Sequence, residues 1–157
     1  MSVSPRLITF DAKDIDVDSA NQSGNTDLAF AYSLCSEYGL ALKLYNKKMV
    51  VYDITAYEKK KAKYTIKRDQ LGGGDSYSIT RQITTVYDSV KMQYTDGKKG
   101  DALTYEYKIP GTSGKRQMFI TSKAESYGDA EKKAKASLRE NRRKSQSITL
   151  RLIGSAK

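Results

Sequence analysis

The sequence contains no histidine, and this absence removes several kinds of catalytic and metal-binding site. Histidine is the commonest general base near neutral pH and a usual zinc ligand. Without it, neither a Ser-His-Asp triad nor a Cys-His pair can form. We therefore expect a protein that is not an enzyme and that holds no metal or cofactor.

Cysteine and long apolar runs are also scarce. The single cysteine, Cys35, cannot form an internal disulfide, and its place on the apolar side of an expected helix predicts an inert, buried thiol. No apolar run approaches the roughly 20 residues that a bilayer requires, and the N-terminus lacks a signal-peptide pattern. We expect no membrane insertion and a cytoplasmic location in the producing cell.

Charge is abundant but unevenly distributed. The formal net charge is +10, yet residues 11–27 carry five Asp and only one Lys. Basic residues dominate from Lys43 onward, particularly in residues 59–63 and 132–144. This asymmetry is compatible with assembly between copies, with binding of other proteins, or with nucleic-acid binding.

The clearest local structure is predicted between residues 26 and 53. A helix over residues 26–38 begins at a cap supplied by Thr26 or Asn25, and Gly39 ends it. Its broad apolar face predicts a core element, so that replacing Leu28 or Leu34 by Asp should unfold the domain. A Leu-rich hairpin follows, with its turn at residues 46–48. The apolar face comprises Leu28, Phe30, Ala31, Tyr32, Leu34, Cys35 and Tyr38.

Alternating apolar and polar residues predict several further strands. The expected strands lie at residues 7–10, 14–18, 64–66, 77–83, 90–94, 103–108, 117–121 and 148–152. The alternating Asp residues of 14–18 do not match a calcium loop, since Ser19 and Asn25 stand where Gly and Glu are needed. The glycines of residues 72–74 do not have the G-x-x-x-x-G-K-[ST] spacing of a phosphate-binding loop. A short turn or helical stub is expected at residues 53–58.

A second helix is predicted over residues 127–143, with Ser126 as its cap. One side is narrow and mostly small, which suits close packing on a sheet. The opposite side carries the candidate interaction residues Lys132, Lys135, Arg139, Arg142 and Arg143. These cations are typical of a surface that faces solvent or another subunit. Alternatively, they could contact the phosphate backbone of a nucleic acid. Nucleic acid is the less favoured partner, because no aromatic or amide side chains lie between the cations.

The predicted fold class is α+β, with mostly antiparallel strands and hairpins and two helices, at about 26–38 and 127–143. We expect an acidic N-terminal arm or strand over residues 1–24 and an α+β domain over 25–157. The domain can be divided into a helix plus hairpin (25–58) and a sheet plus helix (59–157).

Three blocks, taken in order, resemble a known family. They are SANQSGNTDLAFAYSLCSEYGLALKLYNKKMVVYD (residues 19–53), ITRQITTVYDSVKMQYTD (79–96) and ESYGDAEKKAKASLRENRRKSQSITLRLIG (125–154). Together they are similar to the phage late control D proteins, which are baseplate hub proteins of contractile tails. The hub part of type VI secretion spike proteins is a structural relative of that family.

The resemblance implies an architectural role without catalytic or metal residues. It implies a hub-type domain that links tail tube and spike through protein–protein contacts, forms a homotrimer in the full-length protein and contacts other baseplate subunits. It further implies a place in a phage or phage-like tail particle, assembled in the cytoplasm of the bacterial cell. Family members are typically longer, so the chain resembles a portion of a hub protein or a short relative.

Overall fold

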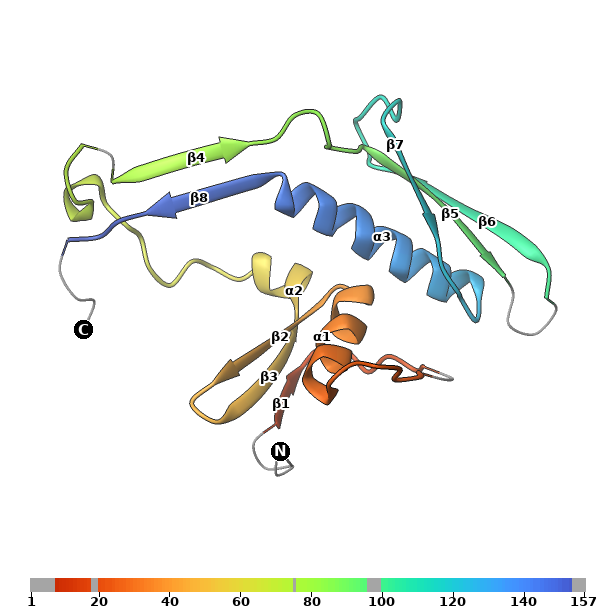
Figure 1. Ribbon diagram of the computed structural model, residues 1–157. Coiled ribbons are helices and arrows are strands. Elements are labelled where there is room, and N and C mark those ends of the chain that lie inside the picture. Colours follow the sequence, from red (N-terminus) through yellow and green to blue (C-terminus); the bar gives the residue numbers. More distant parts are fainter. Residues whose placement is uncertain (1–7, 18–19, 75, 96–99, 154–157) are drawn as a thin grey trace.

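The computed structural model describes residues 8–17, 20–74, 76–95 and 100–153. Its central element is helix α3 (Tyr127–Lys144), which lies between a small N-terminal unit and a three-stranded sheet (Figure 1). A two-stranded ribbon extends beyond the C-terminal end of α3 (Figure 1). This is the predicted α+β class, and both expected helices are present.

The N-terminal unit consists of a narrow sheet and one helix. Strand β3 (Lys48–Asp53) lies between β1 (Ile8–Asp11), to which it is parallel, and β2 (Leu40–Tyr45), to which it is antiparallel. Helix α1 (Asp27–Glu37) packs on β2. The Thr26 side chain caps α1 by accepting from the Ala29 N–H at 3.3 Å, as predicted. Leu42 and Val51, which face each other across β2 and β3, form its small buried centre.

The hairpin turn and the stub after it follow from local chemistry. Asn46 and Lys47 both have positive φ, at 47° and 61°, as a tight turn between twisted strands requires. Lys48 belongs to β3, so the turn is shorter than expected. Helix α2 (Ile54–Glu58) begins where the Asp53 carboxylate accepts from the Thr55 and Ala56 N–H groups. The predicted stub is therefore confirmed.

The main core lies between α3 and the sheet of β5 (Ser89–Thr95), β6 (Ala102–Lys108) and β7 (Gln117–Thr121). In the order β6-β5-β7, β5 and β6 are antiparallel, as the predicted fold class implies for most strands, whereas β5 and β7 are parallel. Alanines let α3 approach the sheet closely. The buried cluster comprises Val90, Met92, Tyr94, Tyr105, Ala124, Ala130, Ala134 and Leu138.

The loop from β6 to β7 is held by Asp88, just before β5. Its carboxylate accepts from the Ser113 hydroxyl and from the Gly114 and Arg116 N–H groups, at 3.0 to 3.2 Å. These bonds fix the loop beside the start of β5. The chain can therefore cross that end of the sheet and enter β7 parallel to β5.

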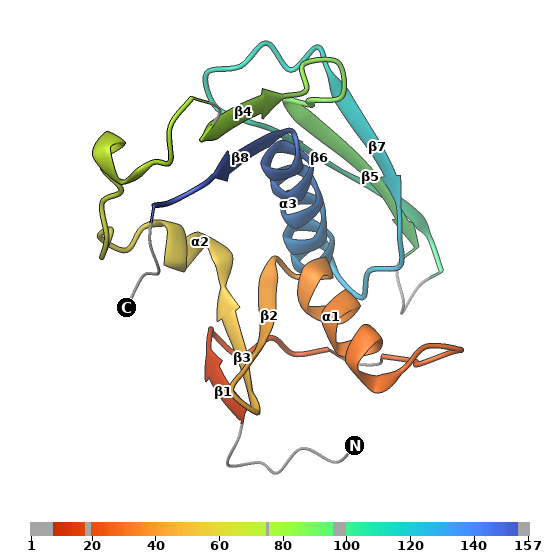
Figure 2. The same cartoon turned by 60° about the vertical axis from the view of Figure 1, so that its left-hand side comes forward.

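The ribbon pairs β4 (Tyr77–Arg81) with β8 (Gln146–Leu150), which continues directly from α3. The segment joining α2 to the ribbon contains a short 3₁₀ turn, η2 (Arg68–Gln70). Beyond the ribbon, Leu71 and Leu152 form an isolated bridge. Figure 2 shows the ribbon directed away from α1 and from the three-stranded sheet.

Two predicted strands are wrong. Residues 14–17 and 64–66 have no regular structure, although their sequences alternate. A strand requires a neighbouring strand to receive its backbone hydrogen bonds, and neither segment has one in the described part of the chain. Tyr64 is 88% exposed as a result. Leu7 and Asp18, which end two of the predicted strands, lie outside the described residues, as do residues 96–99 of the turn expected at 96–100.

The prediction that α1 is a core helix is wrong, because much of the surface of the helix is exposed. None of its residues is buried, and Leu28 and Tyr32 are 43% and 59% exposed. The narrow sheet covers only one side of α1, where Phe30, Leu34 and Cys35 are half-buried. Cys35 is therefore not fully buried, although burial still raises the pKa of its thiol.

Candidate interaction surfaces

The five cations predicted on α3 point toward different surroundings. Lys135 forms an ion pair with Glu131 at 2.5 Å and lies 4.8 Å from the centre of the Tyr107 ring. Arg143 pairs with Glu140 at 2.8 Å. The Lys135–Glu131 hydrogen bond raises the pKa of Lys135 and lowers that of Glu131. These two cations are neutralised by carboxylates on their own helix.

The remaining three cations are also spread apart. The Arg139 guanidinium donates to the Thr55 hydroxyl at the start of α2. Arg142 donates to the Tyr87 carbonyl oxygen at 3.4 Å, beside β5. Lys132 is exposed. The structure thus distributes the predicted cations between two neighbouring elements and solvent, and most of them contact groups of this chain.

Lys133, which the sequence did not single out, occupies the junction between the N-terminal unit and α3. Its ammonium group pairs with Glu37 at 3.0 Å and with Asp129 at 3.2 Å, and it donates to the Lys123 carbonyl at 2.9 Å. It also lies 5.3 Å from the centre of the Tyr38 ring. Burial lowers the pKa of Lys133, but the hydrogen bonds with Glu37 and Asp129 outweigh burial, and the pKa is raised.

A shallow groove of about 730 Å³ runs between α1, α3 and β7. Most residues that line it carry a hydroxyl, amide or charged group, among them Tyr32, Ser36, Glu140 and Lys144, although apolar atoms make up the larger part of the wall. Among the described residues, no hydrogen bond joins a hydroxyl group of the groove to one of its carboxylates. Among the described residues, no group of three or more acidic or cysteine side chains is placed to hold a metal ion.

The ribbon presents an apolar face that the rest of the described chain does not cover. The register places Tyr77 opposite Leu150 and Ile79 opposite Ile148, so these four side chains share one face. They are between 42% and 59% exposed. Serine and threonine occupy the other face. An isolated two-stranded sheet is at best marginally stable in water, so this apolar face is a candidate protein-binding surface.

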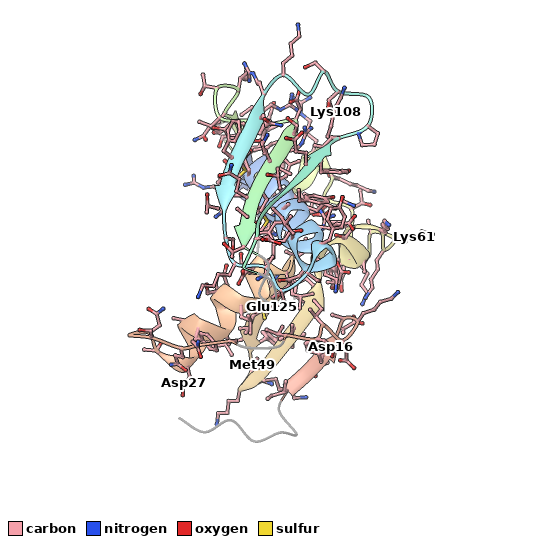
Figure 3. All side chains as sticks on the ribbon, turned by 90° about the vertical axis from the view of Figure 1, so that its right-hand side faces the viewer. Asp16, Asp27, Met49, Lys61, Lys108 and Glu125 are labelled. Atoms are coloured by element: carbon pink, nitrogen blue, oxygen red, sulfur yellow. The ribbon has the colours of Figure 1, made fainter. Side chains whose placement is uncertain are left out.

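An arginine lies at or just past the end of each ribbon strand, and an aspartate lies in the first turn of α1. Arg81 ends β4, Arg151 follows β8, and both are exposed. Figure 3 shows Asp16 and Asp27 on the N-terminal unit, far from Lys108 at the end of β6.

Sequence comparisons place the chain in no family: no family profile matches it, and no curated protein matches it. No helix in the described part of the chain is both long and apolar enough to cross a membrane.

Solved structures of tail proteins share its fold. A tail protein from Neisseria meningitidis MC58 aligns with 97% of this chain and 47% of its own, with a TM-score of 0.66 and 17% identity. The prophage tail protein gp18 from Listeria monocytogenes EGD-e aligns with 91% of this chain and 45% of its own (TM-score 0.61, 17% identity).

A 43 kDa tail protein of prophage MuSo2 from Shewanella oneidensis aligns with 94% of this chain and 43% of its own (TM-score 0.58, 14% identity). The chain spans less than half the length of these three proteins. It therefore has the fold of one part of phage tail proteins.

Proposed function

We propose that this chain is a structural component of the baseplate hub in a phage or phage-like contractile tail, where it links tail tube and spike by protein–protein contacts. The observation that carries the proposal is the fold shared with tail proteins over nearly the whole chain. The order of the three sequence blocks resembling late control D proteins supports the hub assignment.

In this proposal residues 25–157 form the hub-type domain and residues 1–24 its acidic arm. The partners are other baseplate subunits, the tail tube and the spike, and the full-length protein is a homotrimer. The chain belongs to the tail particle, is assembled in the bacterial cytoplasm and catalyses no reaction. The open groove, where no described hydroxyl group is hydrogen-bonded to a carboxylate, and the uncovered apolar ribbon favour binding over catalysis.

The α3 cations have a limited part in this proposal. Lys132 and Arg143 are exposed and suit contact with acidic patches of a neighbouring subunit. Arg139 and Arg142 contact Thr55 and Tyr87 of this chain, which orients them toward α2 and β5.

The decisive experiment locates the chain in a particle. Tail particles would be purified by sedimentation from the producing cells and analysed by mass spectrometry, and cryo-electron microscopy would place the chain. We expect it in stoichiometric amount where tube meets spike. Deleting its gene should yield particles without baseplates. Intact tails from the deletion strain, or particles that lack the chain, would overturn the proposal.

Nucleic-acid binding, the alternative reading of the charge, is tested separately. We expect only weak association with random DNA or RNA at 150 mM salt, because Lys135 and Arg143 are already paired with carboxylates. Micromolar binding with a steep salt dependence, lost in a Lys132→Glu, Lys135→Glu variant, would favour the alternative.

A further inference from the structure

Strand β7 lies at an edge of the three-stranded sheet, and one side of its backbone has no partner strand. In the described part of the chain β7 pairs only with β5. Arg116 and Ser122, directly before and after β7, both form backbone hydrogen bonds with β5 at 3.2 Å. Because successive residues of a strand bond alternately to its two sides, the even-numbered residues of β7 face β5. The N–H and C=O groups that point to the free edge are those of Gln117, Phe119 and Thr121.

This free edge lacks the features that usually protect an edge strand from pairing. Natural edge strands carry charged side chains, proline or bulges. β7 contains neither a charged residue nor proline, whereas β6, the other edge of the same sheet, carries Glu106 and Lys108. Phe119, at the centre of β7, is 70% exposed. A row of unpaired N–H and C=O groups of this kind is a template for a further strand.

The groove between α1, α3 and β7 lies beside the same strand. Met118 lines it from β7, Tyr32 from α1 and Asn141 from α3. The groove shares wall residues, Ser33 and Ser122 among them, with a second hollow of about 330 Å³ that reaches the segment before α1. The two hollows thus form one extended groove. An extended groove beside an open strand edge suits an extended peptide better than a compact ligand.

We propose that an extended segment of a partner protein pairs with the free edge of β7 and places alternate side chains in the groove. It becomes the fourth strand of the sheet, at the usual spacing of about 4.8 Å. The edge supplies backbone hydrogen bonds to the segment, and the groove selects its side chains. This inference goes beyond the proposed tail function and does not depend on it.

The two faces of β7 define the chemistry of the partner segment. Its side chains on the outer face meet Phe119 and are best apolar or aromatic, since such cross-strand pairs stabilise a sheet. Its side chains on the other face enter a groove lined by hydroxyl and amide groups, so that small hydrogen-bonding residues fit there. The carboxylates of the groove, Glu37 and Glu140, are already in ion pairs, and the segment therefore needs no charge.

Two substitutions at Phe119 separate the backbone contact from the side-chain contact. Phe119→Pro removes the central N–H of the free edge but no hydrogen bond to β5, so the variant should remain folded. Phe119→Thr removes the ring, keeps the N–H and serves as the matched control. Circular dichroism and thermal unfolding would verify both. Met118→Pro, which removes a bond to β5, should in contrast destabilise the chain.

The probe is a capped heptapeptide in which tyrosine and isoleucine alternate with serine and threonine, titrated into the isotope-labelled chain and followed by NMR. It should bind wild type and Phe119→Thr, and bind Phe119→Pro at least about ten-fold more weakly, the effect of one lost hydrogen bond. Two versions of the peptide, each N-methylated at one of the two alternating sets of residues, test the backbone from the other side. One should bind like the parent and the other at least about ten-fold more weakly, because only one edge of the peptide faces β7.

Hydrogen exchange locates the contact. Without peptide, the amides of Gln117, Phe119 and Thr121 should exchange faster than those of Met118 and Ile120, which are bonded to β5. The peptide should slow the first set and leave the second nearly unchanged.

Several results would overturn the proposal. They are equal exchange of the two sets of amides in the free chain, a peptide that does not bind at millimolar concentration, and equal binding by wild type and Phe119→Pro. Equal binding of the two N-methylated peptides would also contradict it. A peptide that protects the amides of β4 or β8 instead of β7 would overturn it as well and would assign strand addition to the ribbon.

Discussion

At the scale of single residues, Lys133 joins the N-terminal unit to α3. Its side chain is only 12% exposed and is shared by Glu37 and Asp129. We expect Lys133→Met to lower the free energy of unfolding by about 1–3 kcal/mol, because two carboxylates lose a hydrogen-bonded partner. Lys132→Met, at an exposed neighbouring position, should cost less than about 0.5 kcal/mol. Urea unfolding at pH 7 compares the two variants.

The raised pKa of Lys133 determines how this effect depends on pH. A lysine whose pKa is higher in the folded state contributes its full stabilisation below the unfolded value, about 10.4, and loses it as pH rises through the folded value. The difference in the free energy of unfolding between wild type and Lys133→Met should therefore be constant from pH 6 to 9 and shrink above about pH 10.5. An undiminished difference at pH 11.5 would show that packing, not charge, stabilises the junction.

Sequence reasoning could have found the pairing of Lys133 with Asp129, four residues away on the same helix, but not its contact with the N-terminal unit. Residues 132–144 carry six other cations, and the partner Glu37 belongs to a distant part of the chain. Caps such as Thr26 and Ser126 were predictable, because their partners lie three residues away. The five predicted cations were correctly placed on α3, but contacts such as Arg139 with Thr55 depend on tertiary structure.

At the scale of elements, α1 and α3 contribute unequally to stability. Leu138 on α3 is 2% exposed and belongs to the main core, whereas Leu28 on α1 is 43% exposed. We expect Leu138→Ala to lower the free energy of unfolding by about 2–5 kcal/mol and Leu28→Ala to lower it by less than about 1 kcal/mol. The Leu28→Asp variant should remain folded, contrary to the expectation from the sequence. Thermal and urea unfolding would measure all three; equal losses at both leucines would mean that α1 is as deeply packed as α3.

The hairpin turn contains a residue that is poorly suited to its conformation. Lys47 has a φ of 61°, a value that glycine adopts without steric cost. Lys47→Gly should raise the free energy of unfolding by about 0.5–1 kcal/mol, since Asn-Gly is the preferred pair in such turns. Lys48→Gly removes the same charge within strand β3 and should instead destabilise by a similar amount. If both variants lose stability, the turn does not adopt this conformation in solution.

The elements that sequence could predict are those with local signals. Helices α1 and α3, the β2–β3 and β5–β6 hairpins and the α2 stub all have caps, turns or alternation within a few residues. Residues 64–66 alternate equally well but have no neighbouring strand in the described part of the chain, so the pattern alone was insufficient. The parallel pairs β1–β3 and β5–β7 join segments that are not adjacent in sequence, and no local signal indicated them.

At the scale of the whole molecule, the described residues divide unevenly between core and surface. Eleven hydrophobic residues are buried, whereas twenty large hydrophobic residues are exposed. The exposed apolar side chains lie on the ribbon and also on the other elements, for example Tyr45 in β2 and Phe119 in β7, while the core is concentrated between α3 and the β6-β5-β7 sheet. Stability should therefore vary strongly along the chain.

Hydrogen exchange would measure that variation directly. In the isolated chain at low concentration, the amides of β5 should exchange slowest, because Val90 and Met92 are fully buried, and those of β4 and β8 fastest among the strands. When the chain is assembled with its partners, β4 and β8 should become protected, since covering the apolar face removes the local opening that permits exchange. The already slow amides of β5 provide the internal reference. Ribbon amides that exchange equally fast in both states would mean that the ribbon is not the surface on which assembly depends.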